Sequence, residues 1–145
     1  MLENGKKLTD FSIEKFIGEA IVIDATNGIK PNLDNVKKGD IVFFYTMHTN
    51  KSSSPDFFKE NPGALTKEIA DKLVEKQISI FGVDSFSPDN EPDDTIHKIL
   101  FKKDILIVEN LVNLEKLKGK RFKCYILPLK IQDADGAPCR VIGII

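Results

Sequence analysis

The segment IVFFY, Ile41–Tyr45, shows most directly what kind of sheet this chain builds. Its apolar side chains follow one another without the polar alternation of a half-exposed strand, so the segment is typical of a strand buried on both faces. Three other short runs resemble it, and they are Ala20–Asp24, Ile78–Asp84 and Ile105–Val108. We therefore predict four buried strands at the centre of the fold.

Two helical patterns lie between these strands. Thr66 is a predicted N-cap, because a Thr side chain there can accept a hydrogen bond from the first turn of a helix. Apolar residues then recur at helical spacing, which predicts one stripe packed on the core. That stripe is Ile69, Ala70, Leu73, Val74 and Ile78. A second helix is predicted to begin at Asp93 or Asp94 and to end at about Lys103.

Two C-terminal segments, Phe122–Ile131 and Pro138–Ile145, flank the dipeptide Asp135-Gly136. Asp-Gly between two strand-like segments is a strong signal for a two-residue hairpin turn. Strands that are mixed with helices and closed by a hairpin indicate an α/β fold with a mixed sheet and flanking helices. At 145 residues the chain is long enough for a real core, and we expect a single domain over residues 1–145.

The composition excludes several classes of partner. There are 21 Lys and Arg residues and 22 Asp and Glu residues, so the net charge of -1 leaves no footprint for nucleic acid or an anionic membrane. No apolar stretch of about 18 residues occurs, and the N-terminal MLENGKKLTD has no apolar signal core, so we expect a soluble cytoplasmic protein. Cys124 and Cys139 are interpreted as two buried free thiols, although a disulfide between their strands is geometrically possible.

The best candidate site combines His97 with Glu109. The chain has only two histidines, so it cannot supply a three-histidine metal site alone. A helix from His97 to Lys103 spans roughly 9 Å, and a strand from Ile105 to Glu109 returns roughly 13 Å. If the helix and the strand run in opposite directions, the His97 and Glu109 side chains should therefore lie at about the same height along the strand. An imidazole and a carboxylate meeting there could bind Zn²⁺ or a similar ion. The alternatives are a His–Glu hydrogen bond at a strand end, or a Glu109 side chain directed to solvent.

Other polar residues are weaker candidates. Asp84, Ser87 and Asp89 follow the third strand, where loops of α/β folds commonly contact ligands. Turn formation and helix capping explain them equally well. His48 follows the second strand in a polar loop and is interpreted as a solvated surface histidine. Asp24, at the end of the first strand, is either a further candidate or a capping residue.

Several segments together resemble a known family. They are IGEAIVIDAT (Ile17–Thr26), KKGDIVFFYT (Lys37–Thr46), GVDSFSPD (Gly82–Asp89), His97, ILIVENLVNLEKL (Ile105–Leu117) and LPLKIQDADGAPCRVIGI (Leu127–Ile144). In this order they resemble the putative cyclase family, which includes bacterial kynurenine formamidases. The resemblance spans essentially the whole chain, and its most specific part is the His97–Glu109 spacing together with the pattern E-N-L-x-N-L.

The resemblance implies a metal-dependent amidohydrolase on a swivelling β/β/α-type fold, commonly oligomeric. In that family the active site holds one or two divalent ions, usually zinc or manganese. The histidine and glutamate of its C-terminal half are metal ligands, and they map onto His97 and Glu109. From their place after the third strand, Asp84 and Ser87 are the candidate substrate-binding residues, while the catalytic residues stay unknown. A small-molecule substrate and a homo-oligomer are the expected partners.

One departure from the family is large. Its signature H-x-G-T-H-x-D-x-P-x-H, which supplies further ligands and the general base, does not occur here. In relatives it falls just before the segment that matches Glu3–Gly18, so we expect the chain to correspond to the C-terminal two-thirds of the family fold. Two ligands are too few for the usual catalytic zinc site. We therefore expect weak metal binding and little or no activity from the isolated chain.

Two other interpretations remain open. The chain could be a non-catalytic remnant that acts as a scaffold or binding subunit in a homo- or hetero-oligomer, because a lost segment would leave apolar surface for a partner to cover. Alternatively, the natural protein is longer and contains the missing motif upstream.

Overall fold

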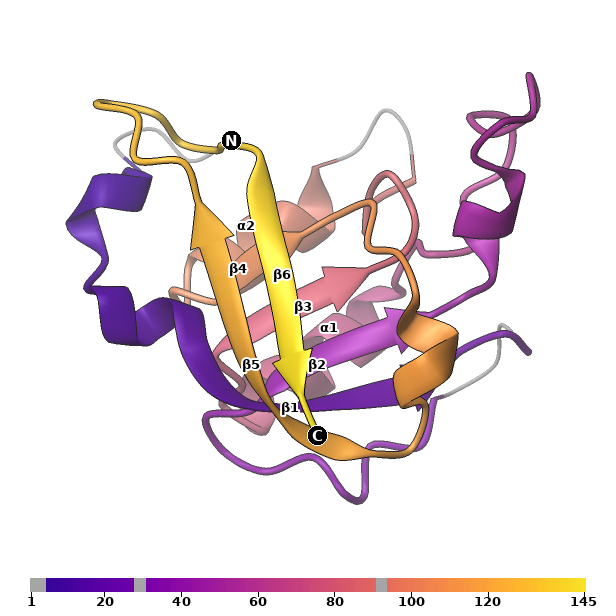
Figure 1. Ribbon diagram of the computed structural model, residues 1–145, viewed down its shortest axis with the longest axis horizontal. Coiled ribbons are helices and arrows are strands. Elements are labelled where there is room, and N and C mark those ends of the chain that lie inside the picture. Colours follow the sequence, from indigo (N-terminus) through magenta and orange to yellow (C-terminus); the bar gives the residue numbers. More distant parts are fainter. Residues whose placement is uncertain (1–4, 28–30, 91–93) are drawn as a thin grey trace.

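The computed structural model describes residues 5–27, 31–90 and 94–145, and it contains a curled mixed sheet with two α-helices (Figure 1). The strands are β1 Ile17–Asp24, β2 Ile41–Tyr45, β3 Ile80–Val83, β4 Leu106–Val108, β5 Arg121–Pro128 and β6 Cys139–Ile144. The helices are α1 Lys67–Glu75 and α2 Thr95–Phe101, and the short 3₁₀ helices are η1 Leu8–Asp10, η2 Ile13–Phe16, η3 His48–Lys51 and η4 Leu114–Leu117. No helix among these described residues is long and apolar enough to cross a membrane.

The six strands lie in the order β4-β3-β2-β1-β5-β6. The four strands from β4 to β1 are parallel neighbours, whereas β5 is antiparallel to β1 and β6 is antiparallel to β5. Parallel neighbours need a crossover connection. α1 supplies it between β2 and β3, and α2 supplies it between β3 and β4. The predicted α/β fold with a mixed sheet is therefore confirmed.

Alternate side chains of the central strands enter two separate cores. On the face toward the helices, Phe44 of β2 and Phe81 of β3 pack edge to face, with ring centroids 5.2 Å apart. Leu73 of α1 and Leu100 of α2 belong to the same core and are fully buried. Each helix therefore buries one apolar stripe on the sheet, as the spacing of the α1 stripe predicts.

The opposite face is covered by the sheet itself. β5 and β6 cross in front of the parallel strands, while the two helices lie behind them (Figure 1). Phe122 and Ile126 of β5 share a core with Val22 of β1 and Phe43 of β2, and Leu114 of η4 completes it. Both faces of β2 are buried, and accordingly its side chains are apolar apart from the hydroxyl of Tyr45.

A partly buried ion pair joins β5 to the turn before β2. The carboxylate of Asp40 accepts two hydrogen bonds from the guanidinium of Arg121, at 2.6 and 2.9 Å. It also accepts one from the N–H of Lys37 at 2.8 Å. Asp40 is buried, and a buried carboxylate needs such partners. The two-pronged contact fixes where β5 begins relative to the parallel strands.

Both predicted helices form. The Thr66 hydroxyl accepts a hydrogen bond from the N–H of Ile69 at 3.3 Å, so the predicted N-cap of α1 is confirmed. α2 begins at Thr95 with Asp94 at the N-cap position, in agreement with one of the two predicted starts. The other predicted start, Asp93, lies outside the described residues.

The C-terminal hairpin differs from its prediction. β5 ends at Pro128 and β6 begins at Cys139, so a longer connection replaces the two-residue turn predicted at Asp135-Gly136. The N–H of Leu129 donates to the carbonyl of Pro138 at 3.0 Å, but Pro138 has no N–H with which to return a bond. The regular ladder therefore stops before the Asp-Gly pair is reached.

The prediction of two buried thiols is wrong for Cys139. Both cysteines are free, and Cys124 is buried as expected, whereas Cys139 is exposed. It begins β6, which lies at the edge of the sheet and, among the described residues, pairs with β5 alone. Cys124 pairs with Gly143, which lies four residues from Cys139 along β6, or roughly 13 Å. That separation is too large for a disulfide, whose Cα atoms lie within about 7 Å.

Gly82→Ala is predicted to destabilise the fold. An added Cβ would lie 2.5 Å from Cδ1 of Phe43 and 2.8 Å from Cδ1 of Leu111. We expect the free energy of unfolding to fall by about 1–3 kcal/mol, the usual cost of overpacking a core, as measured by urea denaturation. Gly136→Ala is the control, because nothing lies within 4 Å of its added Cβ. Equal stabilities of the two variants would contradict this account.

Candidate functional site

The candidate site lies at the carboxyl ends of β3 and β4. Glu109 directly follows β4. Beyond it, the N–H of Asn110 donates to the carbonyl of Ser85 at 2.9 Å, and the N–H of Leu111 donates to the carbonyl of Val83 at 3.1 Å. These two bonds join the segment after β4 to the end of β3 and the residues that follow it, beyond Glu109. The backbone that carries the carboxylate is thus held on both sides, which suits a functional side chain.

Two asparagines turn the chain after Glu109. Asn110 has φ 58° and Asn113 has φ 62°, both in the left-handed region. Asparagine adopts this region more readily than other residues with a side chain. Leu111 and Leu114 follow them into the core. The pattern E-N-L-x-N-L therefore has a structural reason, because each asparagine bends the chain and each leucine anchors it.

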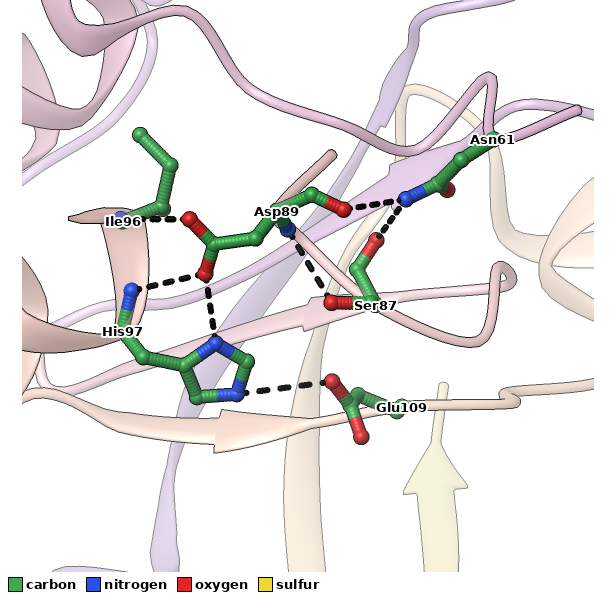
Figure 2. A network of polar contacts seen from close by, with 6 residues as sticks. All are labelled: Asn61, Ser87, Asp89, Ile96, His97 and Glu109. Atoms are coloured by element: carbon green, nitrogen blue, oxygen red, sulfur yellow. Dashed lines mark hydrogen bonds and ion pairs between the residues drawn. The ribbon is translucent and has the colours of Figure 1, made fainter. Parts of the chain in front are cut away.

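His97 lies between two carboxylates (Figure 2). Its Nδ1 is 2.6 Å from Oδ2 of Asp89, and its Nε2 is 3.5 Å from Oε1 of Glu109. His97 comes from α2, Asp89 from the loop before α2, and Glu109 from the end of β4. The predicted approach of His97 and Glu109 is therefore confirmed. At 3.5 Å their contact is longer than an ordinary N–H···O hydrogen bond.

Glu109 is partly enclosed by the protein. Its side chain is 32% exposed, and this burial raises its pKa because it disfavours the ionised form. Attraction to His97 lowers the pKa, whereas the nearby charge of Asp89 raises it. Glu109 also lines a groove of about 500 Å³, together with Phe101 and Ile126. The carboxylate therefore borders open space as well as His97.

Asp89 has a capping role that sequence reasoning offered as one alternative. Its carboxylate is buried, and Oδ1 accepts the N–H of Ile96 at 2.6 Å while Oδ2 accepts the N–H of His97 at 3.0 Å. Asp89 thus caps α2 from the preceding loop. What the sequence did not indicate is its contact with the His97 ring, because that contact depends on how the loop folds back.

Asn61 holds the loop that carries Asp89. Its side-chain amide donates to the carbonyls of Ser87 at 3.0 Å and Asp89 at 2.6 Å (Figure 2). Its oxygen accepts a hydrogen bond from the hydroxyl of Ser85. The two loops approach closely at Gly63, where an added Cβ would lie 2.4 Å from Cβ of Ser85. No motif marks Asn61 in the sequence, because its partners lie more than twenty residues away.

The predicted substrate-binding residues, Asp84 and Ser87, occupy different environments. Asp84 is fully buried, and its Oδ1 accepts the N–H and the hydroxyl of Thr46 at 2.8 and 2.6 Å. Its Oδ2 has no hydrogen-bond partner in the described part of the chain. The Ser87 hydroxyl accepts the N–H of Asp89 at 3.1 Å. Substrate contact by either residue stays a prediction. Asp24 accepts two hydrogen bonds from the residue two positions later, which is a turn role.

The prediction that His48 is a solvated surface residue is wrong. His48 is only 1% exposed, and its ring centroid lies 4.4 Å from that of Phe57 and 5.8 Å from that of Phe86. Neither ring nitrogen has a hydrogen-bond partner among the described residues. The overlooked signal was the aromatic residues in two otherwise polar loops, which cover the histidine ring as they bury their own apolar surface.

His97 and Glu109 fit a metal ion as part of a site. Imidazole nitrogen and carboxylate oxygen are both common zinc donors. The Asp89 contact at Nδ1 matches the carboxylate–histidine pairing that accompanies metal-bound histidines, and it leaves Nε2 toward Glu109. Within residues 5–27, 31–90 and 94–145, no group of three or more His, Cys, Asp or Glu residues could hold a metal ion. A complete site therefore needs donors beyond this pair.

Comparison with known proteins identifies the family. The model of the family described as putative cyclase matches residues 1–90. Kynurenine formamidase from Bacillus cereus is 31% identical over 96% of this chain and 68% of its own length. The enzyme of the same name from Bacillus cytotoxicus is 32% identical over the same shares. The chain belongs to the putative cyclase family.

Solved structures agree with the fold. A potential metal-dependent hydrolase with cyclase activity superposes with a TM-score of 0.83 at 25% identity, covering 99% of this chain and 72% of that chain. Isatin hydrolase A from Ralstonia solanacearum shares the fold with a TM-score of 0.79 at 21% identity, over 97% and 65% of the two chains. The cyclase-type fold implied by the sequence resemblance is therefore confirmed.

Asn61→Asp is predicted to loosen the loop that carries Asp89. The substitution keeps the oxygen that faces Ser85 but replaces two N–H donors by an oxygen that faces two carbonyls. We expect a loss of about 1–3 kcal/mol in the free energy of unfolding, measured by urea denaturation. Asn50→Asp, at an exposed position, is the control for the added charge. A stability equal to that of the control would show that the Asn61 amide does not hold the loop.

Proposed function

We propose that this chain carries part of the active site of a metal-dependent hydrolase of the cyclase and kynurenine formamidase type, with His97 and Glu109 as two of the metal ligands. The observation that carries the proposal is the arrangement of His97, whose Nδ1 is held by Asp89 while Nε2 lies 3.5 Å from Glu109. Membership of the family supports it, because a protein with the same fold is described as a potential metal-dependent hydrolase with cyclase activity.

The residues of this chain would have distinct roles. His97 would bind a divalent ion, zinc or manganese, through Nε2, and Glu109 would bind it through its carboxylate. A bound ion of this kind supplies an activated water molecule and polarises a carbonyl group. Glu109 is already partly desolvated, so binding a cation would compensate the burial that raises its pKa. The further ligands would come from outside the described residues or from another chain.

The substrate class follows from the relatives and from the groove. Kynurenine formamidase and isatin hydrolase are both named for reactions at aromatic compounds, so we propose an amide or related cyclic C–N or C–O bond as the target. The groove beside Glu109 is lined mainly by apolar residues, among them Phe101, Leu106 and Ile126. Such a lining suits a ring-bearing substrate whose reactive carbonyl approaches the carboxylate.

Removal of either ligand should abolish metal binding. By calorimetry with zinc chloride, we expect the 145-residue chain to bind weakly, and His97→Ala and Glu109→Gln to show no measurable binding, because two donors become one. Glu115→Gln, at an exposed position in the same region, is the matched control and should bind like the unmodified chain. With the formamide of kynurenine as probe, hydrolysis by the chain alone should stay near the level of His97→Ala.

Two outcomes would contradict this account. Zinc binding that is the same in His97→Ala and in the unmodified chain would remove the pair from the metal site. Tight stoichiometric zinc binding, together with hydrolysis well above the His97→Ala level, would show that the chain alone forms a complete metal site with more donors than His97 and Glu109.

A second candidate function is that of a scaffold or binding subunit in a homo-oligomer, and the exposed apolar residues on β5 and β6 support the association that it requires. The antiparallel register places Tyr125 opposite Ile142 and Leu127 opposite Arg140, so these side chains share the outer face of the two strands. Leu127, Ile142 and Ile144 are exposed there. β6 is also an edge strand, and exposed apolar edges are common sites of association.

Oligomerisation through this surface has a direct test. We expect light scattering to give a mass above that of one chain, and the double variant Ile142→Lys and Ile144→Lys to shift it to the monomer, because buried like charges would oppose each other. Val112→Lys, at another exposed apolar residue, is the control. A monomeric unmodified chain would contradict the proposal.

A further inference from the structure

Asp89 makes more contacts than a helix cap requires. A capping side chain accepts one or two of the free N–H groups in the first turn. Asp89 accepts those of Ile96 and His97, and it also contacts Nδ1 of the His97 ring at 2.6 Å (Figure 2). The Asp89 residue is only 6% exposed, so water contributes little to this arrangement.

The third contact determines where the His97 ring carries its proton. An ionised carboxylate only accepts hydrogen bonds, so the nitrogen that contacts it must carry the hydrogen. In a neutral imidazole this leaves the other nitrogen, Nε2, with its lone pair free. That nitrogen is the one that lies 3.5 Å from Glu109. Phe101, one turn further along α2, contacts the His97 ring edge to face at 5.4 Å and helps to fix its plane.

We propose that Asp89 is a positioning residue, which holds His97 in the tautomer with the proton on Nδ1 and directs the Nε2 lone pair toward Glu109. The metal-binding consequence rests on the function proposed above, whereas the tautomer does not. The Asp89 carboxylate thereby fixes both the start of α2 and the orientation of the His97 ring. The backbone bonds fix where the helix begins, and the ring bond fixes how the first-turn histidine is oriented.

Asn61 supports the positioning from the opposite side. It donates to the carbonyl of Asp89 at 2.6 Å, and the Ser87 hydroxyl accepts the N–H of Asp89 at 3.1 Å. The backbone of Asp89 is therefore held by both of its polar groups while the carboxylate contacts α2. Such support keeps the Asp89 carboxylate in place beside the His97 ring when His97 gains or loses a metal ion.

The test begins with the unmodified 145-residue chain without metal. Nitrogen-15 NMR of the imidazole groups distinguishes the two tautomers, and His97→Gln identifies the His97 signals, because His48 is the one other histidine in the sequence. At a pH where the ring is neutral, we expect a protonated Nδ1 and an unprotonated Nε2. A protonated Nε2 in the unmodified chain overturns the proposal without recourse to any variant.

Asp89→Asn separates positioning from capping. Asparagine is as good a capping residue as aspartate, but it has a single acceptor oxygen and no charge. We expect a modest decrease in melting temperature together with a gain of the tautomer protonated on Nε2. Asp34→Asn, at an exposed position outside this network, is the matched control, because it removes the same charge and leaves the Asp89 carboxylate in place. It should keep the tautomer of the unmodified chain. A merely capping Asp89 would leave the tautomer unchanged in both variants.

Zinc calorimetry on the same proteins connects the tautomer to binding. We expect Asp89→Asn to weaken zinc binding by about 10–100-fold, the usual effect of losing the partner of a metal-bound histidine. Zinc binding that is equal in Asp89→Asn and in the unmodified chain would overturn the positioning role of Asp89 and leave the proposed function intact. If the unmodified chain shows the expected tautomer but binds no zinc, the proposed metal site fails and the control of the tautomer by Asp89 stands.

Discussion

The structure depends on the need to bury both faces of four parallel strands. The two helices pack on one face only, so the other face needs a different cover. β5 and β6 provide it by curling across the sheet, and the bidentate contact between Arg121 and Asp40 fixes the point where this curl begins. The same constraint explains why β2 contains no charged side chain and why β3 needs a glycine opposite Phe43.

The same architecture brings the residues of the candidate site together. α2 runs back along the sheet and β4 runs out again, so the first turn of the helix lies beside the end of the strand. That geometry brings His97 to Glu109, and the turn at Asn110 keeps the strand end from continuing into solvent. Asp89 then serves two purposes with one carboxylate, since it caps α2 and contacts the His97 ring. A change in this loop therefore affects the helix and the site together.

Much of this could be predicted because the signals are local or follow from simple geometry. The central strands are recognisable from continuous apolar runs, α1 from Thr66 and its stripe, and the approach of His97 to Glu109 from the rise per residue of a helix and a strand. Three of the failures have one cause in common. The burial of His48, the exposure of Cys139 and the position of Asn61 all depend on how distant segments pack.

The sequence by itself determined the class of fold, the order of its elements, the family and the pair of side chains at the centre of the site. These follow from periodicity, from turn chemistry and from motifs whose parts are close along the chain. Only the tertiary structure decided that Asp89 contacts the His97 ring, that Asn61 holds the Asp89 loop, and that β5 and β6 cover the second face of the sheet. The physical reason is that directional hydrogen bonds between loops, and the curl of a sheet, depend on three-dimensional positions that no local pattern encodes.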